Sequence, residues 1–268
     1  MKINDLELNV KAIGTGTPLI WGHGLMLSMA AEDMIPWGIR WVKLADIAHI
    51  VRYDARGHGL SEASDDPHDY HWSNLAQDML ALADNFGFDS FVASGQSMGC
   101  ATSIYAALAA PDKIKALVLV TPPTAWETRA AQADFYEKEA EIVESRGVEA
   151  LVKMIAQAPV TATWQTQAYP DMGQTFLTGL RSFSPQALTQ VLRGAKLCNL
   201  PDRTQLKAIT MPTLILAWTD DPGHPVSSAE EIAGLLPNVQ LSVARSADDV
   251  AGWTQQIRYF LKCFNKST

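Results

Sequence analysis

The sequence has few cysteines, no excess of basic residues and no long apolar run. Its 268 residues include three cysteines, Cys100, Cys198 and Cys263. An odd number at wide spacings fits neither a disulfide framework nor a set of zinc ligands. Lys and Arg number 21 against 29 Asp and Glu, a net charge of -8 that disfavours nucleic acid as a partner. Apolar runs such as Ala116–Val120 are far shorter than the roughly 20 residues that span a bilayer. We therefore expect free thiols and neither a membrane nor a nucleic-acid partner.

The first residues also lack the uninterrupted apolar stretch of a secretory signal, because Lys2, Asp5 and Glu7 place charges there. Together with the unpaired cysteines, this predicts a soluble protein in the reducing cytoplasm. No residue pattern indicates a metal site or an organic cofactor, so we expect neither. The partner class that remains is a small-molecule substrate, and the sequence carries no signal for the oligomeric state.

Apolar residues are abundant enough for one core with a modest insertion, at 47% of the chain against 19% charged residues. Helical patterns alternate with short runs that are rich in apolar or β-branched residues and predict strands. These runs are Glu7–Ile13, Leu19–Trp21, Ile50–Tyr53, Phe91–Ser94, Leu117–Val120, Thr213–Ala217 and Val239–Ala244. The alternation predicts an α/β fold, with a mostly parallel sheet wrapped by helices.

The alternation is interrupted once, between about residues 124 and 200. That stretch contains helical patterns, such as Asp134–Ser145 and Val148–Gln157, but no convincing strand. We predict that 124–200 is a helical cap inserted into a core formed by 1–123 and 201–268. Aromatic residues in the insertion suit a small apolar ligand, and we expect Trp126 and Trp164 to influence which substrates enter.

Ser97 lies in the motif Gly95-Gln96-Ser97-Met98-Gly99, directly after one predicted strand and directly before a predicted helix. A serine on such a sharp strand-to-helix turn has strained backbone angles, and glycines are needed where side chains would collide with the strand and helix. The turn lifts the hydroxyl into a cleft at a helix N-terminus, where backbone amides favour developing negative charge. This placement predicts that Ser97 is a nucleophile.

The chain resembles the α/β-hydrolases over essentially its whole length. His23-Gly24 is similar to the His-Gly pair that family members carry after this strand, where the next residue supplies one amide of the oxyanion hole. Asp54–Ser61 is similar to the family's DxRGxGxS turn, which is structural. The resemblance implies an eight-stranded sheet with an inserted cap. It also implies an oxyanion hole formed by the amide of Leu25, or alternatively of Met26, and by that of Met98, the residue after the nucleophile.

The turn after the Thr213–Ala217 strand resembles the one that carries the family's catalytic acid. Asp221 fits best, because the family's acid often precedes a proline by four residues and Pro225 supplies that proline. Asp220 is the alternative.

The family's histidine is missing from its usual loop after the last strand, since no histidine occurs between 225 and 268. Asp248 and Asp249 stand in that loop, but a carboxylate is a much weaker base than an imidazole unless burial raises its pKa. The six histidines are His23, His49, His58, His68, His71 and His224. The first five fit structural turns, a strand end or the surface, so His224 is the candidate base, with a role at the turn or in solvent as the alternative.

These residues predict a serine hydrolase that cleaves an ester-like bond, a carboxylester or a lactone, in a small organic substrate. The triad would be Ser97, His224 and Asp221. The resemblance disfavours haloalkane dehalogenase and the usual epoxide hydrolase chemistry, because those relatives use Asp at the position of Ser97. Two alternatives stay open: a weak or inert ligand-binding descendant that has lost its base, and a carbon–carbon bond hydrolase or other cofactor-free activity on the same scaffold.

Overall fold

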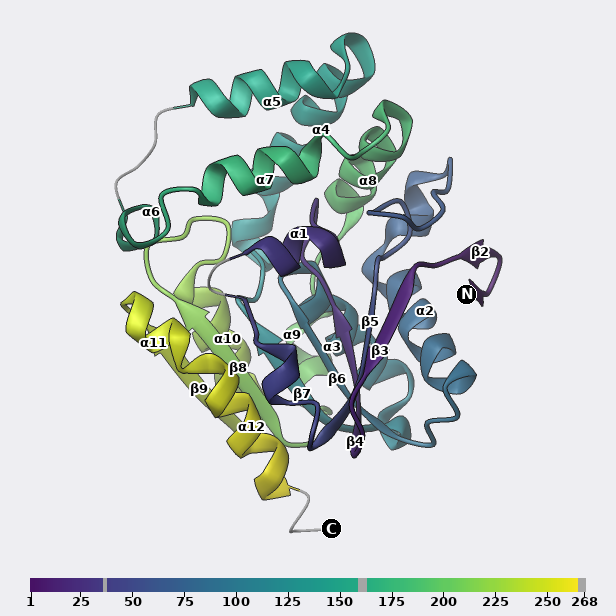
Figure 1. Ribbon diagram of the computed structural model, residues 1–268, viewed down its shortest axis with the longest axis vertical. Coiled ribbons are helices and arrows are strands. Elements are labelled where there is room, and N and C mark those ends of the chain that lie inside the picture. The colour runs from purple at the N-terminus through teal and green to yellow at the C-terminus, as the bar shows by residue number, and fades with distance from the viewer. Residues whose placement is uncertain (36–37, 159–162, 265–268) are drawn as a thin grey trace.

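Seven strands form one sheet in the order β3-β5-β4-β6-β7-β8-β9. The computed structural model describes residues 1–35, 38–158 and 163–264 (Figure 1). The strands are β3 (Val10–Ile13), β4 (Thr17–Gly22), β5 (Ala48–Tyr53), β6 (Phe91–Gln96), β7 (Ile114–Val120), β8 (Thr213–Trp218) and β9 (Val239–Ala244). Only the edge strand β3 is antiparallel to its neighbour, and the other pairs are parallel. The predicted α/β class is confirmed.

The strand count differs from the expectation of eight, because the described residues give this sheet seven. The first strands, β1 (Lys2–Ile3) and β2 (Leu6–Glu7), pair with each other in a separate two-stranded sheet. The predicted strand over 7–13 is broken at Asn9, whose backbone N–H donates to Ser61 Oγ at 2.9 Å and whose side-chain amide donates to Asp54 Oδ2 at 2.8 Å. These bonds take the place of ladder pairing, so the main sheet begins at Val10.

Both faces of the sheet are buried, and side chains alternate between two apolar clusters as the period of a strand requires. In β7, Leu117 and Leu119 face one cluster while Val118 and Val120 face the other. The helices α2 (Trp72–Asn85), α3 (Met98–Ala109) and α10 (Val226–Leu235) pack on the first face. The second face is covered by η1 (Trp41–Lys43), α11 (Ala247–Ala251) and α12 (Trp253–Phe264).

The segment between β7 and β8 is helical, and the described part of 124–200 contains no strand. It holds η4 (Trp126–Thr128), α4 (Arg129–Arg146), α5 (Val148–Gln157), α6 (Trp164–Ala168), α7 (Met172–Leu180) and α8 (Pro185–Leu197), and α9 (Arg203–Leu206) follows. Figure 1 shows α4, α5, α7 and α8 stacked at one end of the sheet, beside α1 (Met29–Met34), which follows β4. These helices share an apolar cluster of their own. The division of the chain at 123/124 and 200/201 stays a prediction.

Arg129 holds the two ends of this segment together. It is 3% exposed, and its Nε and Nη2 donate to the carbonyls of Cys198 at 2.9 Å and Ala195 at 2.6 Å. The guanidinium also lies over the rings of Trp72 and Tyr136, 4.6 and 5.2 Å from their centroids. The start of α4, the end of α8 and α2 of the core therefore meet at one buried cation.

Short 3-10 turns connect the remaining elements: η2 (Pro67–Tyr70) precedes α2, and η3 (Pro111–Lys113) precedes β7. All three cysteines are free; Cys100 and Cys198 are buried. Within the described residues, none of the helices has the length and apolar character needed to cross a membrane.

Candidate active site

Ser97 occupies the sharp turn between β6 and α3, with φ 51° and ψ -107°. This left-handed conformation is strained for a residue with a side chain. The turn exists because three glycines let β4, β6 and α3 approach closely: a Cβ on Gly99 would lie 2.0 Å from the carbonyl oxygen of Gly22, and one on Gly95 would lie 2.5 Å from the carbonyl carbon of Gly99. The sequence indicated Gly95 and Gly99, and Gly22, directly before His23-Gly24, completes the contact.

The structure brings Ser97, His224 and Asp221 into one hydrogen-bonded chain. His224 Nε2 lies 2.8 Å from Ser97 Oγ, and His224 Nδ1 lies 2.8 Å from Asp221 Oδ2. An ionised carboxylate can only accept, so Nδ1 carries the proton that it donates to Asp221. Nε2 is then the acceptor for the Ser97 hydroxyl. This is the arrangement in which an imidazole can take a proton from a serine.

Several donors converge on Asp221. Oδ2 also accepts from Trp218 Nε1 at 2.8 Å, and Oδ1 accepts from the backbone N–H of Gly223 at 2.9 Å. Burial raises the pKa of this carboxyl, but attraction to His224 and the hydrogen bonds from His224, Trp218 and Gly223 outweigh burial and lower the pKa to about 2. Asp221 is therefore ionised at neutral pH. No sequence pattern pointed to Trp218, the last residue of β8, whose indole donates to this carboxylate.

The neighbouring Asp220 is oriented differently. Its Oδ2 accepts from Thr219 Oγ1 at 3.0 Å, and its backbone has a φ of 62°. No hydrogen bond joins Asp220 to His224 in the described structure. Of the two carboxylates considered from the sequence, Asp221 is the one that contacts the imidazole.

The other five histidines do not hydrogen-bond to Ser97. His23 Nε2 accepts from the backbone N–H of Ala55 at 2.9 Å, so its Nδ1 donates to the carbonyl of Gly24 at 2.8 Å. Burial lowers the pKa of His58 to about 3, and its Nδ1 lies 2.9 Å from the carbonyl of Arg56. Both are neutral groups that hold turns. His49 lies on β5 and packs edge-on against Phe88, His68 is exposed to solvent, and His71 is the N-cap of α2.

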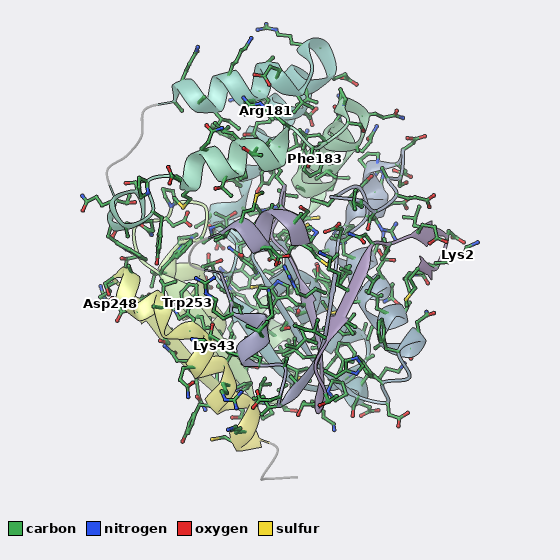
Figure 2. The ribbon with its side chains drawn as sticks, viewed as in Figure 1. Lys2, Lys43, Arg181, Phe183, Asp248 and Trp253 are labelled. Carbon is green, nitrogen blue, oxygen red and sulfur yellow. The ribbon has the colours of Figure 1, made fainter. Side chains whose placement is uncertain are left out.

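The loop after β9, where the resemblance would place the base, folds directly into α11. Ser246 caps that helix, and Asp249 Oδ2 accepts from Arg245 N and Ser246 Oγ at 2.9 Å each. The hydrogen bond from the Arg245 backbone lowers the pKa of Asp249, so this exposed carboxylate is a weak base. Asp248 is exposed on α11 at the edge of the molecule (Figure 2). Neither aspartate is placed to act on Ser97.

Two backbone amides are available for an oxyanion. Leu27 N–H donates to the carbonyl of Gly24 at 3.1 Å, and Met26 has a φ of 59°, so Gly24–Leu27 is a tight turn that presents Leu25 at its second position. Met98 is the first residue of α3. The amides of Leu25 and Met98 donate no hydrogen bond within the part of the chain that the structure describes. Their role as the oxyanion hole, with Met26 as the alternative to Leu25, stays a prediction.

A cavity of about 370 Å³ opens over Ser97, and it is lined by the three residues of the hydrogen-bonded chain, by Leu25 and Leu27, and by residues of α6 and α7. Of the insertion's aromatic residues, Phe176 lines this cavity. Neither Trp126 nor Trp164 lines it, although Trp164 lines an adjoining hollow, and their expected influence on which substrates enter stays a prediction. Trp126 Nε1 donates to the carbonyl of Pro201 at 3.0 Å, and Trp164 Nε1 donates to Thr219 Oγ1 at 3.1 Å.

Comparison with known proteins shows the family of this fold. The family model described as alpha/beta hydrolase fold matches residues 18–255. The chain belongs to this family. Similar solved structures include the enol-lactonase of Burkholderia xenovorans, with a TM-score of 0.80, 19% identity and coverage of 97% of this chain and 98% of that one. For a thermophilic esterase of Thermogutta terrifontis the TM-score is 0.79 and the identity is 23%, with 97% of this chain and 94% of that one covered. At these identities the structures show the fold alone.

Curated relatives of this α/β-hydrolase are also distant in sequence. The 3-oxoadipate enol-lactonase 2 of Acinetobacter baylyi is 24% identical over 249 residues, which covers 91% of this chain and 86% of the relative. The 2-(acetamidomethylene)succinate hydrolase of Mesorhizobium japonicum is 23% identical over 259 residues, which covers 92% of this chain and 86% of the relative. Their names are those of hydrolases, which supports hydrolytic activity for this chain without indicating a bond or a substrate.

Proposed function

We propose that this α/β-hydrolase cleaves a carboxylester or lactone bond of a small organic substrate, with Ser97 as nucleophile, His224 as general base and acid, and Asp221 as the residue that orients His224. One observation carries the proposal: the Ser97–His224–Asp221 chain of 2.8 Å contacts at the base of a cavity. No metal or organic cofactor takes part in it.

In the proposed reaction Ser97 Oγ attacks the substrate carbonyl while its proton moves to His224 Nε2. The carbonyl oxygen becomes an oxyanion and accepts hydrogen bonds from the amides of Leu25 and Met98. When the carbon–oxygen bond breaks, His224 gives the proton to the leaving alcohol oxygen and an acyl-Ser97 ester remains. Water then attacks this ester, His224 takes the water's proton, and the carboxylic acid leaves as Ser97 regains its hydrogen.

The geometry favours this activity over an inert descendant. An imidazole placed between a serine hydroxyl and an ionised carboxylate provides the base whose loss the inert alternative requires. Carbon–carbon bond hydrolysis needs the same three residues, so the contacts alone do not separate it from ester hydrolysis. We propose the ester because its leaving oxygen takes the proton from His224 directly, whereas a carbon leaving group must first be stabilised as a carbanion or enolate.

The test is labelling with a fluorophosphonate, located by mass spectrometry, together with turnover of p-nitrophenyl acetate. We expect the label on Ser97, turnover of the ester, and loss of both in Ser97→Ala with an unchanged circular dichroism spectrum. An unlabelled Ser97 in a folded protein, or a Ser97→Ala variant that keeps most of the activity, would falsify the proposal. Cleavage of a carbon–carbon bond in a diketone, with no ester turnover, would move the assignment to that class.

A further inference from the structure

The charged side chains that line the cavity are all of one sign, apart from what His224 can carry. Among the described lining residues, Asp220 and Asp221 are acidic and none is Lys or Arg. An adjoining hollow of about 700 Å³ shares Asp220, and its described lining has no Lys or Arg either. Three stretches lie outside the described structure: 36–37, 159–162 and 265–268. The two internal ones read Pro-Trp and Pro-Val-Thr-Ala and contain no Lys or Arg, and the C-terminal one reads Asn-Lys-Ser-Thr.

The two carboxylates differ in how their charge is balanced. Asp221 is held by His224 and two further donors. Asp220 has one neutral donor, Thr219 Oγ1, and forms no ion pair within residues 1–35, 38–158 and 163–264. Arg52, a buried guanidinium beside α1, is already paired with Glu32 at 3.1 Å and Asp33 at 2.6 Å. The charge of Asp220 therefore faces the cavity and its entrance without compensation.

Asp220 is also fixed in place. Helix α6 holds the preceding residue from two sides, because Trp164 Nε1 donates to Thr219 Oγ1 and Gln165 Nε2 donates to the Thr219 carbonyl. The Thr219 hydroxyl in turn donates a hydrogen bond to Asp220 Oδ2. The left-handed backbone at Asp220, which Asp tolerates better than most residues, adds a second restraint. These contacts hold the Asp220 backbone and one of its carboxylate oxygens at the cavity.

We propose that the part of the substrate that enters this cavity is uncharged or cationic, and that Asp220 is the residue that discriminates against carboxylate-bearing substrates. The proposal rests on the proposed ester hydrolysis and narrows its substrate class. A substrate carboxylate that leaves water needs a cation or several hydrogen-bond donors to replace its hydration, and the described lining offers no Lys or Arg, only neutral polar side chains such as Gln96 and Thr175. It would also meet the like charge of Asp220, which lines the cavity but is exposed to solvent, so the repulsion is weakened by water and by salt.

The experiment compares two esters that differ in one charge: mono-p-nitrophenyl adipate, which carries a free carboxylate, and its methyl ester. We expect kcat/KM for the methyl ester to exceed that for the anion by roughly tenfold or more in the parent protein. Asp220→Asn keeps the shape and the acceptor for Thr219, and it should shrink this ratio several-fold. The ratio should also shrink in the parent at high salt, since screening weakens a charge effect but not a steric one.

Asp89→Asn is the matched control, because it makes the same change in net charge at an exposed position just before β6, at the opposite end of that strand from Ser97. It should leave the ratio unchanged. The proposal is overturned if the parent hydrolyses the two esters equally well, or if Asp220→Asn and Asp89→Asn give the same ratio as the parent. If the parent hydrolyses neither ester and Ser97 takes no fluorophosphonate, the proposed function itself fails and this inference fails with it.

Discussion

At the scale of single residues, the proposed base His224 and the proposed acid Asp221 are three positions apart in one turn. The backbone N–H of His224 donates to the carbonyl of Asp221 at 3.2 Å, which closes the turn and sets the imidazole against the carboxylate. Local spacing can therefore specify this pair, although the contact with Ser97 spans 127 positions of sequence. A relocated base of this kind needs no histidine after the last strand.

Replacing His224 with Ala should lower kcat for ester hydrolysis by roughly 10³-fold or more, because the Ser97 hydroxyl loses its proton acceptor. Steady-state kinetics with p-nitrophenyl acetate measure the loss. His68→Ala is the control, since that ring is exposed and its ion-pair partner is Asp66. Near-parental turnover in His224→Ala would show that another group activates Ser97.

Asp221 predicts a pH dependence of stability. Its pKa is lowered from 3.8 to about 2 in the folded state, so its ionised form is favoured by folding. The stabilisation is fully present above the unfolded pKa of 3.8 and is lost as the pH falls toward 2, and it amounts to about 2 kcal/mol. Urea unfolding of the parent and of Asp221→Asn should give free energies whose difference shrinks by about 1.5 kcal/mol between pH 5 and pH 2.5, where part of the stabilisation remains. A difference that does not change with pH would contradict the assignment.

At the scale of elements, the serine turn depends on the contact between β4 and the first turn of α3. Gly99→Ala should lower the free energy of unfolding by several kcal/mol or prevent folding, because its Cβ would lie 2.0 Å from the Gly22 carbonyl oxygen and backbone must move to admit it. Gly234→Ala in α10 is the matched control. No atom lies within 4 Å of its Cβ position, and alanine should stabilise that helix by roughly 0.5–1 kcal/mol. Equal effects in urea unfolding would argue against the close packing.

The insertion should select substrates through α7. Phe176→Ala enlarges the cavity directly, so we expect a shift of preference toward longer acyl chains in a series of p-nitrophenyl esters, with kcat/KM for the best substrate moving several-fold. Phe135 is 56% exposed on α4 and serves as the control. An unchanged profile in Phe176→Ala would mean that the acyl chain lies elsewhere in the cavity.

Whether a segment is a strand or a helix was predictable from the sequence where the spacing of its apolar residues fits only one of the two. The strands that are buried on both faces, such as β8, have short apolar runs with clear ends, and the Val239–Ala244 prediction matches β9 in full. The cavity wall was not predictable in the same way. Helical periodicity says that Trp126, Trp164 and Phe176 lie on helices or their ends, but only the packing of those helices on the core decides which of them faces Ser97.

At the scale of the whole molecule, the site is assembled where three separate parts of the chain meet. Leu25 follows β4, Ser97 follows β6, and Asp221 and His224 follow β8. In a parallel sheet the carboxyl ends of the strands lie at one edge, and ligands bind there. The insertion covers this same edge, since residues of α6 and α7 complete the cavity. How the insertion is held on the core therefore bears on the site.

Arg129 is the group that should hold it. Removing this cation in Arg129→Leu leaves the Cys198 carbonyl without its donor, leaves the Ala195 carbonyl with only the Cys198 N–H, and removes the stacking on Trp72. We expect faster amide hydrogen exchange in α4 and α8, with little change in β6 and α3, because an unpaired buried carbonyl and the lost stacking loosen the base of the insertion before the sheet opens. Arg193→Leu is the control within the same helices, as its ion pair with Glu144 at 2.7 Å is partly exposed and contributes little. Equal exchange in both variants would show that apolar packing alone fixes the insertion, whereas faster exchange throughout Arg129→Leu would show that insertion and core unfold as one unit.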